Sequence, residues 1–478
     1  MRNQIAKIII YILLLAAVMF FYRPLMKLDD HYIYAADGEA DLTGFDFTRY
    51  RARVYASGWE YYPERLYTPG DFQAGAIDTP IYENNINSAA YGSYRVTLNL
   101  PPGKTYGITG RSFLYSTKIY INGALADEIG APGSAPETTT PRTNTYAVYF
   151  TPQTDITEII FQVANFQMED GGGSYSFSLG EAGLVERYRL TRLTGAIVVV
   201  GSLITVALLF IGIFIFFTNR RCFLYYALMT LTIAVRIMFT GDKPVMEFFP
   251  DFDWYAGMRI EYLTFVLIFV FALLYFHALY KKLIWRPVFA AALGLSALYG
   301  GVVLFFEPMV FGALNIYFYA LCGAAGLYVL IKLAIGLKNG DIEHILVFTG
   351  ILLFFLAAVN DMIQYSLPVF MRFYDIISVG MLFFVHINMI ALTIGFERTE
   401  KEYNEAKQRE EELTRKTNFY HRVSHDLLTP LTRVSTCVQS AGRYPEDAPE
   451  LLAKAQADIM EMAEMINDAL RRDREGEA

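Results

Sequence analysis

The stretch that decides the fold is residues 196–217, which reads AIVVVGSLITVALLFIGIFIFF and contains no charged side chain. A helix needs about 20 apolar residues to cross the hydrocarbon core of a bilayer, so this run predicts a membrane span. Six similar runs follow it, and together they predict a seven-helix transmembrane region over residues 187–396. These runs are 223–239, 262–280, 288–306, 310–330, 342–366 and 373–396.

The composition agrees with a membrane protein. Hydrophobic residues make up 54% of the chain and aromatic residues 15%, which is high for a soluble protein. The net charge is -8 and no long basic run is present, so nothing indicates a nucleic-acid partner. Cys222, Cys322 and Cys437 show neither a CxxC pair nor zinc spacing, and we expect no disulfide and no structural metal.

Charges between the apolar runs predict the orientation, because short cytoplasmic loops collect Lys and Arg. Basic residues occupy every second loop, and the loops between them are acidic. The C-terminus is therefore expected in the cytoplasm and the segment before the spans outside the cell. Residues 1–29, with Arg2 and Lys7 before an apolar run, are expected to be a membrane anchor or signal segment. The distance of Ala35 and Ala36 from that run favours an uncleaved anchor with a cytoplasmic N-terminus.

Residues 30–186 predict an extracytoplasmic all-β domain. Apolar and polar residues alternate over 94–100, 118–126, 156–164 and 174–179, with turn residues between these segments. Asn122 and Gly123 stand at the tip of one expected hairpin, because this pair tolerates the positive φ of a tight turn. Regular strand spacing favours a β-sandwich, with a barrel as the alternative.

After Phe396 the chain becomes charged and helical. Residues 397–417 predict a coiled-coil signalling linker, and residues 418–478 a helical hairpin broken at 442–449. Each helix of the hairpin carries one apolar seam, and two helices cannot bury both seams alone. A homodimeric four-helix bundle is therefore expected. The seam positions are Tyr420, Ser424, Leu427, Leu431, Val434 and Val438 in the first helix, and Leu452, Ala455, Ile459, Met462, Ile466 and Ala469 in the second.

One motif in the hairpin carries chemistry: Ser424-His425-Asp426-Leu427-Leu428-Thr429-Pro430. His425 is one residue off the seam, so its ring should face solvent as a nucleophile requires. Thr429 lies one turn later on the same face, and Pro430 is expected to kink the helix. His421, one turn earlier, lacks such neighbours and is interpreted as a bystander.

Residues 424–431 resemble the H-box of the sensor histidine kinases at every fixed position. The resemblance implies a protein histidine kinase with His425 as phosphoacceptor, Asp426 orienting its ring, and Thr429 placing a water to hydrolyse a response regulator's aspartyl phosphate. The family's Asn box, Asp-x-Gly-x-Gly box and glycine-rich lid are not found in the chain. ATP with Mg is therefore expected only through a catalytic domain not present in this chain, with no cofactor bound by the chain itself.

Residues 40–396 resemble bacterial seven-helix receptors with diverse intracellular signalling modules. The resemblance is carried by Ser-Gly-Trp-Glu-Tyr-Tyr at 57–62, Tyr-Gly-Ser-Tyr-Arg at 91–95, Tyr-Ile-Asn-Gly at 120–123 and Val-Ala-Asn-Phe at 163–166. It implies a jelly-roll outside a bacterial cell membrane and a small polar or carbohydrate-like ligand. Candidate ligand-binding residues are Trp59, Arg95, Arg111 and Asn165. The alternative places Trp59 in the core and the others in strands or turns.

Polar residues within the expected spans are costly, at about 2.5 to 3.5 kcal/mol for a charge at a helix centre. We expect Arg236 to pair with Asp361 or Asp375 as a structural or switching element. The alternative is that such residues lie near span ends and reach water. The costly residues are Arg236, Glu261, Asn360, Asp361, Asp375 and His386.

These features favour a transmembrane sensor of a two-component phosphorelay. A second hypothesis is a non-catalytic receptor or split kinase subunit, whose hairpin dimerises, accepts phosphate in trans or docks a regulator. A transporter that uses the intramembrane charges is a third, and it leaves the histidine motif unexplained.

Overall fold

The computed structural model describes residues 30–475 except 83–89, 112–115, 169–175, 218–219, 281–282, 338–341 and 367–375. The anchor or signal segment expected over 1–29 lies outside the described residues. The chain divides into two compact units, Met1–Asn388 and Met389–Ala478. The boundary falls inside one long helix, α10 (Ile376–Arg443).

The first unit begins with two β-sheets. One has the strand order β1-β3-β11-β6-β9, and the other has the order β2-β5-β10-β7-β8 with β4 added against β5. The strands are β1 Asp30–Tyr34, β2 Glu39–Asp41, β3 Arg51–Tyr55, β4 Glu60–Pro63, β5 Tyr91–Asn99, β6 Tyr106–Arg111, β7 Ser116–Ile121, β8 Ala124–Ile129, β9 Thr145–Phe150, β10 Ile156–Ala164 and β11 Ser176–Glu181. Two short helices, α2 (Pro69–Ala74) and η1 (Pro136–Thr138), lie between strands.

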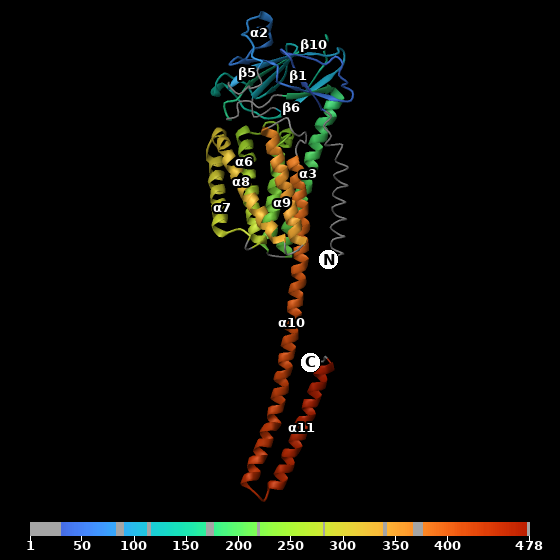
Figure 1. Ribbon diagram of the computed structural model, residues 1–478, viewed down its shortest axis with the longest axis vertical. Helices are drawn as coiled ribbons and strands as arrows, with labels where there is room; N and C mark the ends of the chain where they lie inside the picture. Colours follow the sequence, from blue (N-terminus) through green and yellow to red (C-terminus); the bar gives the residue numbers. More distant parts are fainter. Residues whose placement is uncertain are drawn as a thin grey trace. The chain divides into compact units, whose positions relative to one another are not determined.

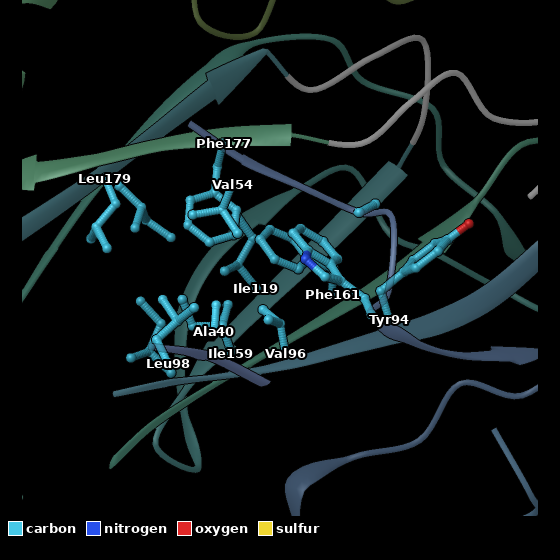
Figure 2. Close-up of a cluster of buried hydrophobic side chains, with 14 of the residues drawn as sticks. Ala40, Val54, Tyr94, Val96, Leu98, Ile119, Ile159, Phe161, Phe177 and Leu179 are labelled. Carbon is cyan, nitrogen blue, oxygen red and sulfur yellow. The ribbon is translucent and has the colours of Figure 1, made fainter. Parts of the chain in front are cut away.

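The two sheets share one apolar core. Val54 and Phe177 from the first sheet meet Val96, Ile159 and Phe161 from the second (Figure 2). Successive residues of a strand point to opposite faces, so the alternation in the sequence places one face of each sheet in this core. The prediction of an N-terminal β-domain is confirmed.

The expected hairpin turn is also confirmed. Asn122 has φ 49° and Gly123 has φ 85°, and they join β7 to β8. Two consecutive residues with positive φ match the twist of the flanking strands, which is why this pair is favoured in a two-residue loop.

The helices of the first unit follow the β-domain (Figure 1). Among the described residues, five helices, α3, α4, α6, α7 and α8, are long and apolar enough to cross a membrane. The runs expected at 342–366 and 373–396 correspond to α9 and the first part of α10, but some of their residues lie outside the described ones. The bounds are α3 Ala182–Phe216, α4 Arg221–Phe239, α5 Pro244–Phe248, α6 Trp254–Leu279, α7 Arg286–Phe305, α8 Pro308–Gly336 and α9 Ile342–Ser366.

The predicted border between domains, after Glu186, falls inside helix α3. Helix α3 begins at Ala182, directly after β11. The first turns of α3 are polar, so the sequence did not indicate them as part of a span. Their side chains form ion pairs that stabilise the helix. Arg189 pairs with Glu186 and with Glu247 of α5, both at 3.0 Å.

The β-domain and the helices of the first unit are tied together by polar and apolar contacts. The guanidinium of buried Arg51 lies 3.4 Å from the ring centroid of Tyr188 on α3. The indole nitrogen of Trp254 donates to the Thr143 hydroxyl at 2.8 Å. Met168, from the loop after β10, belongs to an apolar cluster with Trp254 and Phe311. The sandwich therefore contacts α3, α6 and α8 through three separate segments.

The second unit is a helical hairpin. Helix α10 runs to Arg443, and α11 (Ala448–Glu475) returns beside it (Figure 1). The break falls within the range expected from the sequence. No border separates the coiled-coil linker 397–417 from the hairpin, because α10 is continuous there. Pro430 lies inside α10 without ending it, so the expected kink does not interrupt the helix.

Candidate functional site

The hairpin is held by a narrow inner face. Over residues 397–471, Pro430 on α10 and Ala455 on α11 are the buried residues. Arg433 joins the two helices, with Nη2 at 3.2 Å from Asp458 and 2.8 Å from Glu461. Most other side chains of the hairpin are exposed, so the helices offer wide surfaces to other molecules.

His425 lies on the open surface of α10, with 76% of its side chain exposed. Its Nδ1 atom is 3.5 Å from Oδ1 of Asp426. That separation is slightly beyond ordinary hydrogen-bond range, so the two side chains are neighbours and not a hydrogen-bonded pair. The predicted exposure of His425 agrees with this placement.

Thr429 is exposed one turn after His425. Thr432 and Thr436 donate to the carbonyls four residues before them, at 2.8 and 2.9 Å. Within the described part of the chain, the Thr429 hydroxyl has no such bond. Pro430 beside it has no N–H, so the carbonyl of Asp426 lacks its usual partner in the helix. In the turn that carries His425, the Thr429 hydroxyl and the Asp426 carbonyl thus lack a hydrogen bond within the helix.

The hairpin exposes apolar side chains on both helices. Leu431 and Val438 on α10 are 51% exposed, and Leu452 and Ile459 on α11 are 52% and 54% exposed. These are four of the seam positions expected from the sequence. Ser424, a fifth, is also exposed. The single chain leaves these seam positions exposed, although Ala455 of the same seam is buried.

The described side chains among the candidate ligand-binding residues of the β-domain lie in different surroundings. Trp59 is 2% exposed and stacks on Phe161 in the core. Asn165 is buried, and its side chain binds the backbone of Gln167 and Met168 in a local turn. Both follow the alternative interpretation, as structural residues. The side chain of Arg111 lies outside the described ones.

Arg95 is the candidate that remains on a surface. It bridges Glu158 at 2.7 Å and Glu60 at 3.0 Å, and its guanidinium lies 4.8 Å from the ring of Phe72 on α2. Tyr62 donates to Glu60 at 2.8 Å, and burial, followed by this bond, raises the pKa of Tyr62. Arg95 joins three strands of one sheet and the helix that covers them.

The intramembrane pairing of Arg236 with Asp361 or Asp375 cannot be traced, because both aspartate side chains lie outside the described ones. Arg236 donates to the backbone carbonyl of Glu261 at 2.6 Å. The Glu261 carboxylate pairs with Lys243 at 3.2 Å. Among the described residues, no three His, Cys, Asp or Glu side chains gather as a metal site.

The sequence interpretation missed Asn388, which is fully buried in α10. Its side-chain oxygen accepts a hydrogen bond from Tyr275 of α6 at 3.2 Å, and its amide donates to the Phe384 carbonyl at 2.8 Å. The signal was available, since Asn388 is a polar residue within an expected span. Nothing in the sequence, however, distinguished it from Asn360.

Comparison with known families gives two matches. The family described as 7TM diverse intracellular signalling matches residues 194–394, and the His Kinase A (phospho-acceptor) domain matches residues 415–477. No curated protein and no solved structure matches the chain. Fold and site thus define a membrane protein whose helical bundle continues into a phosphoacceptor hairpin.

Within that class, residues 194–394 are similar to the 7TM receptors with diverse intracellular signalling, and residues 415–477 to the His Kinase A domain. This combination is consistent with a sensor histidine kinase. The second match includes His425, Asp426 and Thr429.

Proposed function

We propose that this chain is the sensor of a two-component phosphorelay, in which His425 accepts a phosphoryl group and passes it to an aspartate of a response regulator. The observation that carries the proposal is the state of the His425 ring. It is 76% exposed, and its Nδ1 faces the Asp426 carboxylate. In the proposed reaction, the neighbouring Asp426 carboxylate orients the ring through Nδ1, and the exposed ring presents Nε2 as the nucleophile.

The transfer needs one bond made and one broken. The Nε2 lone pair of His425 bonds to the γ-phosphorus of ATP, while the bond from that phosphorus to the β,γ-bridging oxygen breaks and ADP leaves. Asp426 holds the Nδ1 proton and stabilises the positive charge that develops on the ring. ATP and Mg would be held by a kinase domain supplied outside the described residues.

The uncovered seam supports a homodimer. Four helices, two from each copy, would bury Leu431, Val438, Leu452 and Ile459 together. His425 lies next to the seam residue Ser424 and stays accessible beside such a bundle. The Thr429 hydroxyl, without an intrahelical bond, is free to orient the water that hydrolyses the regulator's aspartyl phosphate.

The membrane half supplies the signal. We infer seven spans, with both chain termini cytoplasmic and the β-domain, as a jelly-roll, on the outer side of a bacterial cell membrane. A small polar or carbohydrate-like ligand would bind that domain. Supporting the coupling, the domain contacts α3, α6 and α8 through Arg51, Thr143 and Met168.

The test is phosphoryl labelling of the full chain in nanodiscs, with a histidine-kinase catalytic domain added in trans and ATP labelled on the γ-phosphate. Acid-labile label should appear on the wild type and vanish in His425→Gln. His421→Gln is the matched control, since it removes an exposed histidine one turn away on the same helix, and it should keep the label. Absence of label on the wild type, or equal loss in both variants, would favour the non-catalytic receptor instead.

A further inference from the structure

One turn of α10, residues 384–388, collects hydrogen bonds from two other helices; we name it the hub turn. Tyr226 of α4 donates to the carbonyl of Val385, and Tyr275 of α6 donates to the side-chain oxygen of Asn388 at 3.2 Å. Tyr226, Tyr275, Val385 and Asn388 are all fully buried.

Close packing marks the same turn. A Cβ atom on Gly350 of α9 would lie 2.9 Å from the Asn388 amide nitrogen and 3.4 Å from Cγ2 of Ile387. Phe354, one turn further along α9, packs on Phe384 with ring centroids 5.5 Å apart. Only a glycine allows α9 to approach Asn388 so closely. Three helices, α4, α6 and α9, therefore converge on the hub turn.

The bonds at the hub turn hold α10 in one register. Tyr275 reaches Asn388 only at the present rotation of α10, because a rotation by one residue, about 100°, carries the amide away from α6. The apolar contacts are less selective, since aliphatic and aromatic side chains repack with modest cost. The polar contacts are thus the part of the interface with two distinct states, formed and broken.

We propose that the hub turn is the switch by which the helical bundle controls the phosphoacceptor helix, with Tyr226, Tyr275 and Asn388 as positioning residues. With the bonds formed, α10 keeps one position; with them broken, α10 rotates or slides against α4 and α6. Helix α10 is continuous from the hub turn to His425, so the change reaches the phosphoacceptor without a joint. The effect on His425 rests on the proposed phosphorelay function, whereas the movement of α10 concerns the bundle alone.

The experiment measures the position of α10 directly. Spin labels are placed at exposed positions 285 and 401 of the full chain, with the native cysteines replaced and labelled copies diluted by unlabelled ones. Buried interhelical hydrogen bonds in membrane bundles change equilibria by about threefold on average and by about twentyfold at most. Tyr275→Phe and Asn388→Leu should therefore populate a second distance between the labels, and Tyr226→Phe should do so as well.

Tyr299→Phe is the matched control. Tyr299 of α7 is also buried, and its hydroxyl binds the Phe311 carbonyl at 2.9 Å and lies 3.2 Å from the Asn315 side-chain oxygen, both on α8. Tyr299→Phe removes a buried hydroxyl as Tyr275→Phe does, but the lost bonds do not involve α10. The distance between the labels should therefore stay as in the wild type. Tyr275→Phe and Asn388→Leu proteins that fold yet keep the wild-type distance would overturn the proposal. So would an equal shift in Tyr299→Phe.

Labelling of His425 by a kinase domain in trans completes the test. A changed distance with a labelling rate changed at least threefold supports the switch. A changed distance with an unchanged rate overturns its control of His425. If the wild type takes no label at all, the phosphorelay function fails, and the distances still decide whether the hub turn positions α10.

Discussion

Two turns of α10 have opposite environments. In the hub turn, Asn388 is fully buried, and its side chain has partners for both the oxygen and the amide. In the turn of His425, the side chain is 76% exposed and its Nδ1 lies 3.5 Å from the Asp426 carboxylate. The same helix thus has one turn whose polar groups fix its position and one whose polar groups are left for reaction.

The two turns differ because the polar groups of one are paired inside the protein, whereas those of the other face water. A buried amide must be paired, because an unpaired one costs about 1 to 3 kcal/mol. An exposed imidazole loses nothing by facing water and gains access to a partner protein. Substitutions at the buried hub turn are therefore expected to change the stability of the protein. Substitutions beside the exposed His425 are expected to change its rate of phosphorylation.

The largest expected effect is on stability, and it comes from exchanging Asn for Asp in the hub turn and Asp for Asn beside His425. Asn388→Asp puts a carboxylate into a fully buried position within an expected span, at a cost of about 2.5 to 3.5 kcal/mol. Asp426→Asn changes an exposed side chain and should alter stability by less than about 0.5 kcal/mol. Thermal unfolding of the purified full chain measures both. Equal melting temperatures for the two variants would show that burial does not separate the turns.

The next effect concerns rate. Asp426→Asn keeps the shape of the side chain but removes the charge that holds the Nδ1 proton of His425. The labelling rate of His425 should fall by about 10²-fold, with melting unchanged. Glu405→Gln, an exposed acid on the same helix, should retain the wild-type rate. If the two variants lose rate alike, the effect is one of general charge and not of ring orientation.

The sequence predicted one of these turns and not the other. The motif around His425 could be identified because its residue types are rare together and its chemistry needs no distant contact. The role of Asn388 depends on Tyr275 and Gly350, which lie far away in the chain and reach α10 only through folding. A lone polar residue in an apolar run carries no sign of its partner.

The β-domain shows the same limit. Alternation placed the strands at 94–100, 118–126 and 156–164 and the turn at Asn122, because these are local features. It left Trp59 open between a ligand site and the core, since that choice depends on its contact with Phe161 of another segment. It left Asn165 open between a ligand site and a turn, which its bonds to Gln167 and Met168 decide. The start of α3 was also missed, because its polar first turns are stabilised by Glu247 and by contacts with the β-domain.

A smaller effect is expected from glycines. Gly350→Ala adds a methyl group 2.9 Å from the Asn388 amide, and such overpacking costs about 1 to 3 kcal/mol. Gly442→Ala, near the end of α10, has open space around the new Cβ and should stabilise the helix by about 0.5 kcal/mol. Hydrogen exchange, read separately from peptides of each unit, should show faster exchange around residue 388 and slower exchange around residue 442. Tolerance of Gly350→Ala without change would mean that α9 moves freely away from the hub turn.

The smallest effect belongs to the ion pair that joins the hairpin. Arg433→Ala removes contacts to Asp458 and Glu461 across the two helices. Half of the Arg433 side chain is exposed, so water screens the pair and the loss should be about 0.2 to 1 kcal/mol. Arg409→Ala removes a contact to Glu405 within one helix at 4.0 Å and should cost less still. Added salt should shrink the difference between the variants, because exposed charges are screened over about 10 Å at 0.1 M. A loss well above 1 kcal/mol that persists in salt would mean that the seam of the dimer covers Arg433, and that this part of α10 is as buried in the assembly as the hub turn is in the bundle.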